Sequence, residues 1–504
     1  MRNYTILICF IVFKVVLQYT LIGPEYDLQR DEFLHLDQAN HLAWGYTSVP
    51  PVTSWISYFI KLLGNTVFWV KFFPALFGAL TMVVVWKTIE VLKGDFFALI
   101  LGASCITFSV LLRLNTLYQP NSLDVLCWTT FYFFLIKYLH RRQAKWMYLL
   151  AITFAIGFLN KYNIAFLILG IVPAAIISGE RKIWTDRSLY IGVALAFVLI
   201  LPNLIWQYNH DFPVFHHLKE LADTHLVHVS RWSFARSQLL FFPITFPIII
   251  IGLYALMRYP DFQKYQLYLW SFLLTIFIFL FFKAKDYYAI GLYPIYFAFG
   301  SVYISSLLPR RASTAIRAIL IALPIIGFIP MYQLAFPNKS PDYITQHPAP
   351  YRAFGLLTWE DGKEHSLPQD FADMLGWKEL ARMVDSVYAN IPNSRNTLVL
   401  CDNYGQAGAI NYYSRKGIRA VSFNADYLHW FDFSVPYYNL IRVGSGRESD
   451  QEMAKTAPYF RQAMYVGSIT NRHAREFGTA ILCFIEAKID VNKQLQAEIN
   501  AQKR

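Results

Sequence analysis

The chain of 504 residues is 56% hydrophobic and 17% aromatic, but only 15% of its residues are charged. Soluble proteins normally carry about 25% charged residues, so the composition excludes an ordinary soluble enzyme and predicts a chain that lies in membrane lipid. The formal net charge is +12. No basic stripe interleaved with aromatic residues accompanies this charge, so nucleic acid is not expected as a partner.

A scan for apolar stretches of bilayer length, about 20 residues as a helix, predicts about eleven transmembrane helices. They are expected at residues 4–22, 67–92, 95–112, 121–139, 146–160, 162–178, 188–206, 237–257, 265–282, 287–307 and 314–334. No small-residue cleavage site precedes Gly23-Pro24, so the first stretch is expected to remain as a membrane span. Residues 53–64 are too short to cross a bilayer and are expected to form a helix in its interface.

The loops between these stretches alternate in character. One set is short and rich in Lys and Arg, as at Arg141-Arg142 and Arg310-Arg311, which predicts that this set and the N-terminus are cytoplasmic. The opposite loops contain acids, histidines, amides and tyrosines. Their ranges are 23–66, 113–120, 207–236 and 283–286. The odd number of spans predicts that the C-terminal part lies on the same outer side.

Two domains are expected, a transmembrane domain over residues 1–336 and an outer soluble α/β domain over 337–504. Within the second, the pattern predicts an amphipathic helix over 370–388, strands over 396–401 and 479–486, and a loop at Asp402–Gly405 that leads into a helix. Cys401 and Cys483 lie in these strand-like runs. They are expected either to pair or to remain as two buried thiols.

The first outer loop carries the adjacent carboxylates Asp31 and Glu32. A carboxylate in a partly apolar pocket gains basicity and suits removal of a proton from an acceptor. If the segment is helical, Asp31, His35 and Gln38 share one face. The alternative is an acid pair that only stabilises a helix N-terminus.

The second outer turn contains Arg113, Asn121, Ser122 and Asp124. Asn121 or Ser122 is expected to cap the fourth span, with Asp124 in its first turn. A helix N-terminus beside an arginine is also an anion site, and we leave both interpretations open.

The last two outer segments are rich in histidine and lysine. His210 belongs to a run of five histidines in about twenty residues, without a clean metal-ligand spacing, so no metal is predicted, although a divalent ion is possible in principle. Lys283 and Lys285 lie at an outer end of a span, where positive charge is unusual. They are expected either to bind a phosphate at headgroup level or to anchor the helix by snorkelling. Lys161 lies in a similar outer turn.

Several of these motifs together resemble the membrane C-type glycosyltransferases. The nearest group is the bacterial protein mannosyltransferase-like enzymes, which are distantly similar to the lipid A aminoarabinose transferase. The motifs are Asp31-Glu32, His41–Tyr46 before Val49-Pro50-Pro51, Trp206–His210, Lys285–Tyr288, Asp373–Trp377 and Cys401–Ala409. Two departures are Pro120-Asn121 where many relatives have Pro-Asp, and Ser48-Val49-Pro50 where the aminoarabinose enzyme has Glu-Lys-Pro. The second argues against transfer of that sugar.

The resemblance implies a multi-pass enzyme of the bacterial inner membrane that moves a sugar, with inversion, from a polyprenyl phosphate to an outer glycan, lipid or protein acceptor. No cofactor is predicted. Asp31, with Glu32 beside it, is expected to be the base. The donor phosphate is expected at Lys283, Lys285, Arg113 and Tyr287. Other substrate contacts are expected at His41, Tyr46, Asn121, Asp124, Lys161, Trp206, His210 and Asp286.

Two functions from other classes are weighed against this one. A transporter or flippase of lipid-linked glycans requires ionisable residues inside the spans. The spans are largely free of such residues, and the polar residues concentrate in the outer loops, which favours an enzyme. A glycan receptor is also conceivable, but no motif supports it.

Overall fold

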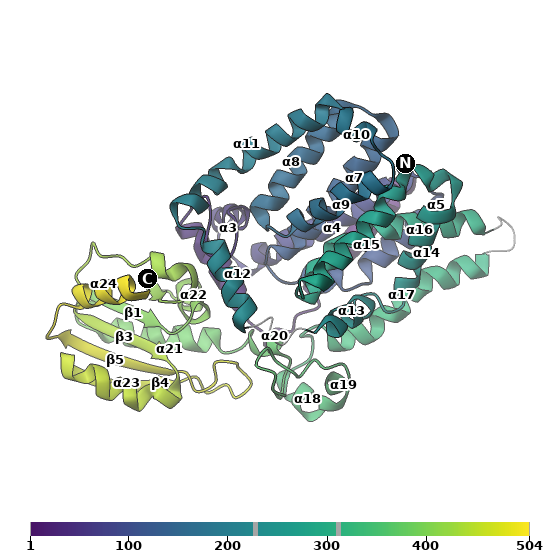
Figure 1. Cartoon of the computed structure of the whole chain (residues 1–504). Helices are drawn as coiled ribbons and strands as arrows, with labels where there is room; N and C mark the ends of the chain where they lie inside the picture. Colours follow the sequence, from purple (N-terminus) through teal and green to yellow (C-terminus); the bar gives the residue numbers. More distant parts are fainter. Residues whose placement is uncertain (1, 225–229, 309–313, 503–504) are drawn as a thin grey trace. The chain divides into compact units, whose positions relative to one another are not determined.

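The computed structural model describes residues 2–224, 230–308 and 314–502, and the chain folds into two compact units (Figure 1). The helical unit comprises Met1–Ile22, Val49–Thr53 and Thr66–Asn338. The mixed unit comprises Gly23–Ser48, Ser54–Asn65 and Lys339–Arg504. Most of the first outer loop therefore folds with the C-terminal part of the chain.

The helical unit is built from long apolar helices that pack in pairs, such as α9 on α15, α14 on α16 and α8 on α11. These helices are α1 (Arg2–Tyr19), α4 (Val67–Val91), α5 (Phe96–Thr107), α7 (Asn121–Arg141), α8 (Ala144–Asn160), α9 (Ile164–Ile177), α11 (Arg187–Asn209), α14 (Phe246–Arg258), α15 (Gln266–Phe281), α16 (Pro294–Leu307) and α17 (Thr314–Leu334). Shorter elements are α6 (Leu111–Leu114), α10 (Lys182–Thr185), α12 (Pro213–Thr224), α13 (Arg231–Leu240), η3 (Pro260–Tyr265) and η4 (Asp286–Leu292).

Each predicted span contains one of these helices, but they differ in length. Among the described residues, five helices are long and apolar enough to cross a membrane, and a bent pair, η4 with α16, makes a sixth. Five further apolar helices have 10–17 residues. The chain is therefore mostly helical with several membrane-spanning helices, and the count of about eleven spans stays a prediction.

Two predicted spans are interrupted. The span predicted over 237–257 is wrong as one helix, because α13 ends at Leu240 and α14 begins at Phe246. Pro243 lies in this gap, and proline removes a helical hydrogen bond and disfavours helix before it. The stretch 287–307 bends by 49° between η4 and α16, where Pro294 begins the second helix.

The mixed unit contains a five-stranded sheet in the order β2-β1-β3-β5-β4 (Figure 1). The strands are β1 (Thr397–Cys401), β2 (Ala420–Ser422), β3 (Asn439–Gly444), β4 (Phe460–Ser468) and β5 (Ala480–Ala487). β2, β1 and β3 are parallel, and β5 and β4 are antiparallel. The helices are α2 (Arg30–Asp37), η1 (Gln38–Asn40), most of α3 (Val52–Leu62), α18 (Pro341–Gln346), α19 (Pro348–Ala353), α20 (Gln369–Ala372), α21 (Trp377–Asn390), α22 (Tyr404–Tyr413), α23 (Ser449–Thr456) and α24 (Val491–Gln502), with short turns η5 (Ser394–Asn396), η6 (Ala425–His429), η7 (Gly446–Glu448) and η8 (Ala457–Tyr459).

The sheet is buried on both faces, which confirms the α/β prediction for this part of the chain. Leu398 and Leu400 belong to a core that also contains Val491 and Leu495 of α24, so alternate residues such as Val399, also buried, point to the other face. Helices α21 and α22 contact the sheet as well. The predicted strands over 396–401 and 479–486 are confirmed as β1 and β5.

The two cysteines of the sheet are buried and unpaired. Cys401 lies in β1 and Cys483 in β5, and β3 separates these strands. Neighbouring strands are about 4.8 Å apart, so the two backbones are about 10 Å apart, beyond the reach of a disulfide. Of the two predicted alternatives, the structure favours buried thiols.

The helix predicted over 370–388 is wrong as a continuous element. It is divided into α20 and α21, and Gly376 between them has a φ of +86°. The carbonyl groups of Asp373 and Met374 in this turn accept hydrogen bonds from the amides of Arg30 (3.2 Å) and Asp27 (2.7 Å). The apolar periodicity continues through the break, but the backbone turns to bind the first outer loop.

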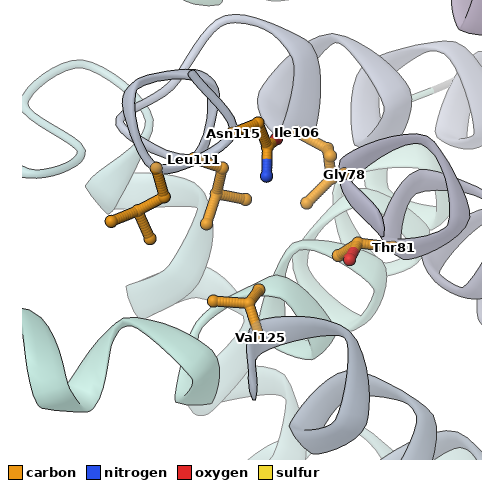
Figure 2. Close-up of a pocket in the computed structure, with 7 residues that line it drawn as sticks. Gly78, Thr81, Ile106, Leu111, Asn115 and Val125 are labelled. Carbon is orange, nitrogen blue, oxygen red and sulfur yellow. The ribbon is translucent and has the colours of Figure 1, made fainter. Parts of the chain in front are cut away.

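A buried polar network in the helical unit fixes the second outer turn. Lys14 of α1 donates to the side-chain oxygen of Asn115 (2.7 Å), and the Asn115 amide donates to Ser122 Oγ (3.0 Å). The amide of Gln18 donates to the Asn115 carbonyl. A cavity of about 10 Å³, room for about one water molecule, lies beside Asn115 and Gly78 and is otherwise mostly apolar (Figure 2). The buried Lys14 is thus an exception to the expectation that the spans are largely free of ionisable residues.

We expect Gly78→Ala to disrupt this network. A Cβ atom at position 78 would lie 2.0 Å from Asn115 Oδ1 and 2.5 Å from Lys14 Nζ. Separation of this buried pair leaves a buried hydrogen-bond donor without its partner, which costs about 1–3 kcal/mol. The measurement is the thermal unfolding midpoint of the purified protein in detergent.

Gly192→Ala is the matched control, because a Cβ atom there meets its nearest neighbour, the Met147 side chain, at 3.3 Å. Alanine in a helix is otherwise slightly favoured over glycine. Equal unfolding midpoints for the two variants would show that the Lys14–Asn115 pair does not stabilise the fold.

Candidate functional site

The predicted acid pair lies at the N-terminus of α2, where its two members have different surroundings. The Gln29 side chain accepts from the amide of Asp31 (2.9 Å), and Glu32 accepts from the amide of Gln29 (2.7 Å), which makes a capping box. Glu32 is fully buried. Its carboxylate therefore stabilises the helix end, which is the structural alternative that the sequence left open. Asp31 is only half-buried.

Asp31 is held by a residue from the C-terminal part of the chain. The Tyr404 hydroxyl donates a hydrogen bond to Asp31 Oδ1 at 2.7 Å. The guanidinium of Arg30 lies 4.4 Å from the centre of the Tyr404 ring. Burial, with the nearby Asp31 charge, raises the pKa of Tyr404 well above its usual value, so its hydroxyl remains a donor.

Helix α2 approaches α22 closely. A Cβ atom at Gly405 would lie 2.6 Å from the Arg30 side chain, and one at Gly408 would lie 2.7 Å from Phe33 Cβ. The Phe33 ring contacts Trp377 (5.7 Å) and Tyr413 (5.7 Å). Two glycines one turn apart thus allow the acid-bearing helix to lie directly on α22.

The rest of the first outer loop is bound in the same way. Asn411 of α22 donates to Asp37 (2.7 Å), and Gln38 donates to Asp426 (2.8 Å). The predicted substrate residue His41 stacks on Trp430 with ring centres 4.3 Å apart. Tyr46 is buried and donates to the carbonyls of His41 (3.0 Å) and Gln38 (3.3 Å). Both therefore have structural roles here.

Ionisable groups near Asp31 are strongly influenced by burial. Burial raises the pKa of Asp373 to about 7, although Arg475, which donates to its carboxylate at 3.1 Å, opposes this shift. Burial lowers the pKa of His35, against the opposing charge of Asp31. His35 contacts Gln38 at 3.4 Å, so the helical face predicted for Asp31, His35 and Gln38 is present. Asp31 thus lies in a partly desolvated polar cluster.

A second cluster forms in the helical unit around Lys161, between α8 and α9. Its ammonium group donates to Asn121 Oδ1 at 2.8 Å and lies 4.5 Å from the Tyr288 ring centre and 5.0 Å from that of Tyr287. Burial lowers the pKa of Lys161 to about 8; Asp124 opposes the shift and Lys285 adds to it. Predicted site residues from three separate segments therefore meet here.

The N-terminus of α7 contributes the acid of this cluster. Asp124 accepts from Trp128 (2.9 Å) and Asn163 (3.0 Å), and Asn163 also donates to the Tyr288 carbonyl (2.9 Å). The predicted capping by Asn121 or Ser122 is wrong, because no side chain within the described residues caps α7. Ser122 instead donates to the Leu114 carbonyl (3.0 Å).

The remaining predicted phosphate ligands are not all brought together. Lys285 is close enough to Lys161 to influence its pKa, whereas Lys283 is exposed. Arg113 donates to Thr116 Oγ1 at 3.0 Å. The carboxylate of Asp286 accepts from the amide of Tyr287 (2.8 Å).

The histidine-rich loop gives no comparable cluster. His210 is exposed and stacks on Trp206 with ring centres 4.1 Å apart. His225 and His228 lie outside the described residues. Among the residues that the structure does describe, no three His, Cys, Asp or Glu side chains gather as metal ligands.

Several residues of both clusters were not predicted as site residues. Asn163 directly follows the predicted Lys161 turn. The sequence gives no signal for the pairing of Tyr404 with Asp31, because 373 positions separate them.

Comparisons with known proteins agree with this architecture. The family described as dolichyl-phosphate-mannose-protein mannosyltransferase matches residues 48–206. Lipid A galacturonosyltransferase RgtD from Rhizobium johnstonii is 27% identical over 198 residues, 37% of this chain and 41% of that protein. The alignment thus spans about two fifths of this curated relative.

Solved structures show the same fold. ArnT from Cupriavidus metallidurans bound to undecaprenyl phosphate aligns with a TM-score of 0.62 and 14% identity over 94% of this chain and 97% of that one. Its apo state aligns with a TM-score of 0.62 and 15% identity over 96% and 98%. The alignments show that the chain has the fold of ArnT, and that residues 48–206 of this membrane protein are similar to the dolichyl-phosphate-mannose-protein mannosyltransferase family.

Proposed function

We propose that the protein is a glycosyltransferase that moves a sugar from a polyprenyl phosphate to an acceptor on the outer side of the bacterial inner membrane. The observation that carries this proposal is the match of residues 48–206 to a family whose description includes a lipid-phosphate-linked sugar. ArnT, which has the same fold, binds undecaprenyl phosphate, and RgtD acts on lipid A. The acceptor in this proposal is a glycolipid, a glycan or a protein.

Asp31 is the base in the proposed reaction. Its carboxylate takes the proton from the acceptor nucleophile, which attacks the anomeric carbon opposite the phosphate. The bond between that carbon and the phosphate oxygen breaks, so the configuration inverts and the polyprenyl phosphate leaves with the bonding electrons. The hydrogen bond from Tyr404 fixes the Asp31 carboxylate, and partial burial partly desolvates it. Both observations support this assignment. Glu32, engaged in the capping box, is assigned no proton transfer.

Lys161 and Lys285 bind the donor phosphate in this proposal. Lys161 is half-buried beside two aromatic rings. Desolvation lowers its pKa; Asp124 opposes this shift and Lys285 adds to it. A phosphate that bound here would compensate the charge of both lysines and accept charge-assisted hydrogen bonds. The leaving phosphate develops negative charge in the transition state, which cations stabilise.

We expect Asp31→Asn to abolish most transfer. Loss of a general base reduces turnover by about 100- to 10,000-fold. The measurement is transfer of radiolabelled sugar from polyprenyl phosphates by the purified variant, compared with its thermal unfolding midpoint.

Glu25→Gln, which removes an exposed acid from the same loop, is the control and should retain activity. Full turnover by Asp31→Asn would refute the assignment of the base. Sugar that stays on its lipid with wild-type protein would favour transport over transfer.

Lys161→Gln should weaken donor binding. Removal of a charged hydrogen-bond donor raises the KM for the donor by about 10- to 100-fold, and free polyprenyl phosphate should inhibit the variant correspondingly less. The assay measures inhibition of transfer over a range of polyprenyl phosphate concentrations.

Lys145→Gln removes another lysine that lies over an aromatic ring, Trp146 at 5.1 Å, and should leave the KM unchanged. Equal KM values for Lys161→Gln and wild type would exclude Lys161 as a phosphate ligand.

A further inference from the structure

The C-terminal part of the chain has a distinctive edge in its sheet. β1 is followed by α22 and then β2 on one side, while β3 lies on the other side of β1. The strand order therefore reverses at β1. In parallel sheets, functional groups gather at such a point, outside the carboxyl ends of the strands. Tyr404 lies at this position, three residues after the end of β1.

Tyr404 is positioned by the local sequence. The Asn403 side chain accepts from the amides of Gly405 (3.0 Å) and Gln406 (3.1 Å), so α22 begins directly at Tyr404. The Gln406 side chain donates to Glu476 (2.6 Å). These contacts hold the start of α22 independently of the first outer loop.

We propose that Tyr404 is a positioning residue for the base Asp31, so that the C-terminal domain contributes directly to the catalytic machinery. This inference rests on the proposed function. A carboxylate held at one oxygen keeps a defined direction toward the proton that it removes, and small errors in such geometry are costly. The short contact of 2.7 Å and the stacked Arg30 fix the Tyr404 hydroxyl against Asp31.

The hydrogen bond also affects ionisation. A donor to the charged form of a carboxylate favours that form over the protonated one. The ionisable groups that face Asp31 are Arg30, Glu32 and His35 on α2, Tyr404 on α22, and Asp373 in the turn before α21. Loss of the Tyr404 hydroxyl should therefore shift the acid side of the pH–activity profile to higher pH.

The test is Tyr404→Phe in the full-length protein, compared with Tyr412→Phe. Tyr412 lies on the same helix as Tyr404. Its ring packs on Phe33 (5.9 Å), and its hydroxyl donates to the Asn65 carbonyl (2.8 Å). We expect kcat of Tyr404→Phe to fall about 10- to 100-fold with KM within about twofold. The acid side of its profile should rise by about one pH unit. Tyr412→Phe should change neither.

A second substitution keeps the test valid if Tyr404→Phe folds poorly. Incorporation of 3-fluorotyrosine at position 404 keeps the ring and hydroxyl but makes the hydroxyl a stronger donor, so the acid side should move to lower pH. Wild-type kcat and pH profile in both Tyr404 variants would overturn the positioning role and leave the proposed function intact. An inactive wild-type protein, by contrast, would refute the proposed function itself and the positioning role with it.

Discussion

A carboxylate proposed as a base needs fixed neighbours, and the Tyr404 hydroxyl that binds Asp31 comes from the C-terminal part of the chain. Helix α2 lies on α22 because Gly405 and Gly408 allow close approach and because Phe33 is enclosed by aromatic rings. The Tyr404–Asp31 hydrogen bond depends on this packing. The C-terminal sheet therefore supports the candidate base rather than forming an independent appendage.

A second constraint concerns the lysines of the helical unit. Cations buried among apolar helices are costly unless polar groups or ligands compensate them. Lys14 is compensated by Asn115, whereas the half-buried Lys161 has one amide oxygen, two aromatic rings, the Asp124 carboxylate and a second lysine nearby. The presence of two lysines close together supports the proposal that Lys161 is a phosphate ligand.

Sequence reasoning succeeded where local pattern determines structure and failed where tertiary contacts do. Hydropathy located a helix in every predicted span, and alternation located β1 and β5. The break at Gly376 was missed because the apolar periodicity continues through it. In the structure, backbone amides of the first outer loop donate hydrogen bonds to the carbonyl groups of this turn. Asn121 was expected to cap α7, but Lys161 binds its side chain instead. Asp31 and Glu32 were predicted as site residues from their charge and from the family resemblance, and this stays a prediction; the partner of Asp31, Tyr404, could not be predicted from the sequence.

The account depends most on the prediction that the outer loops share one side of the membrane. It is tested by single cysteines at the exposed positions Lys61, His210 and Lys283, with Lys145 as the cytoplasmic control, in a Cys9→Ser background. A membrane-impermeant maleimide applied to spheroplasts should label the first three positions and spare the cysteine at 145 until the membrane is permeabilised. Labelling at 283 only after permeabilisation, with labelling at 61 before it, would contradict the account.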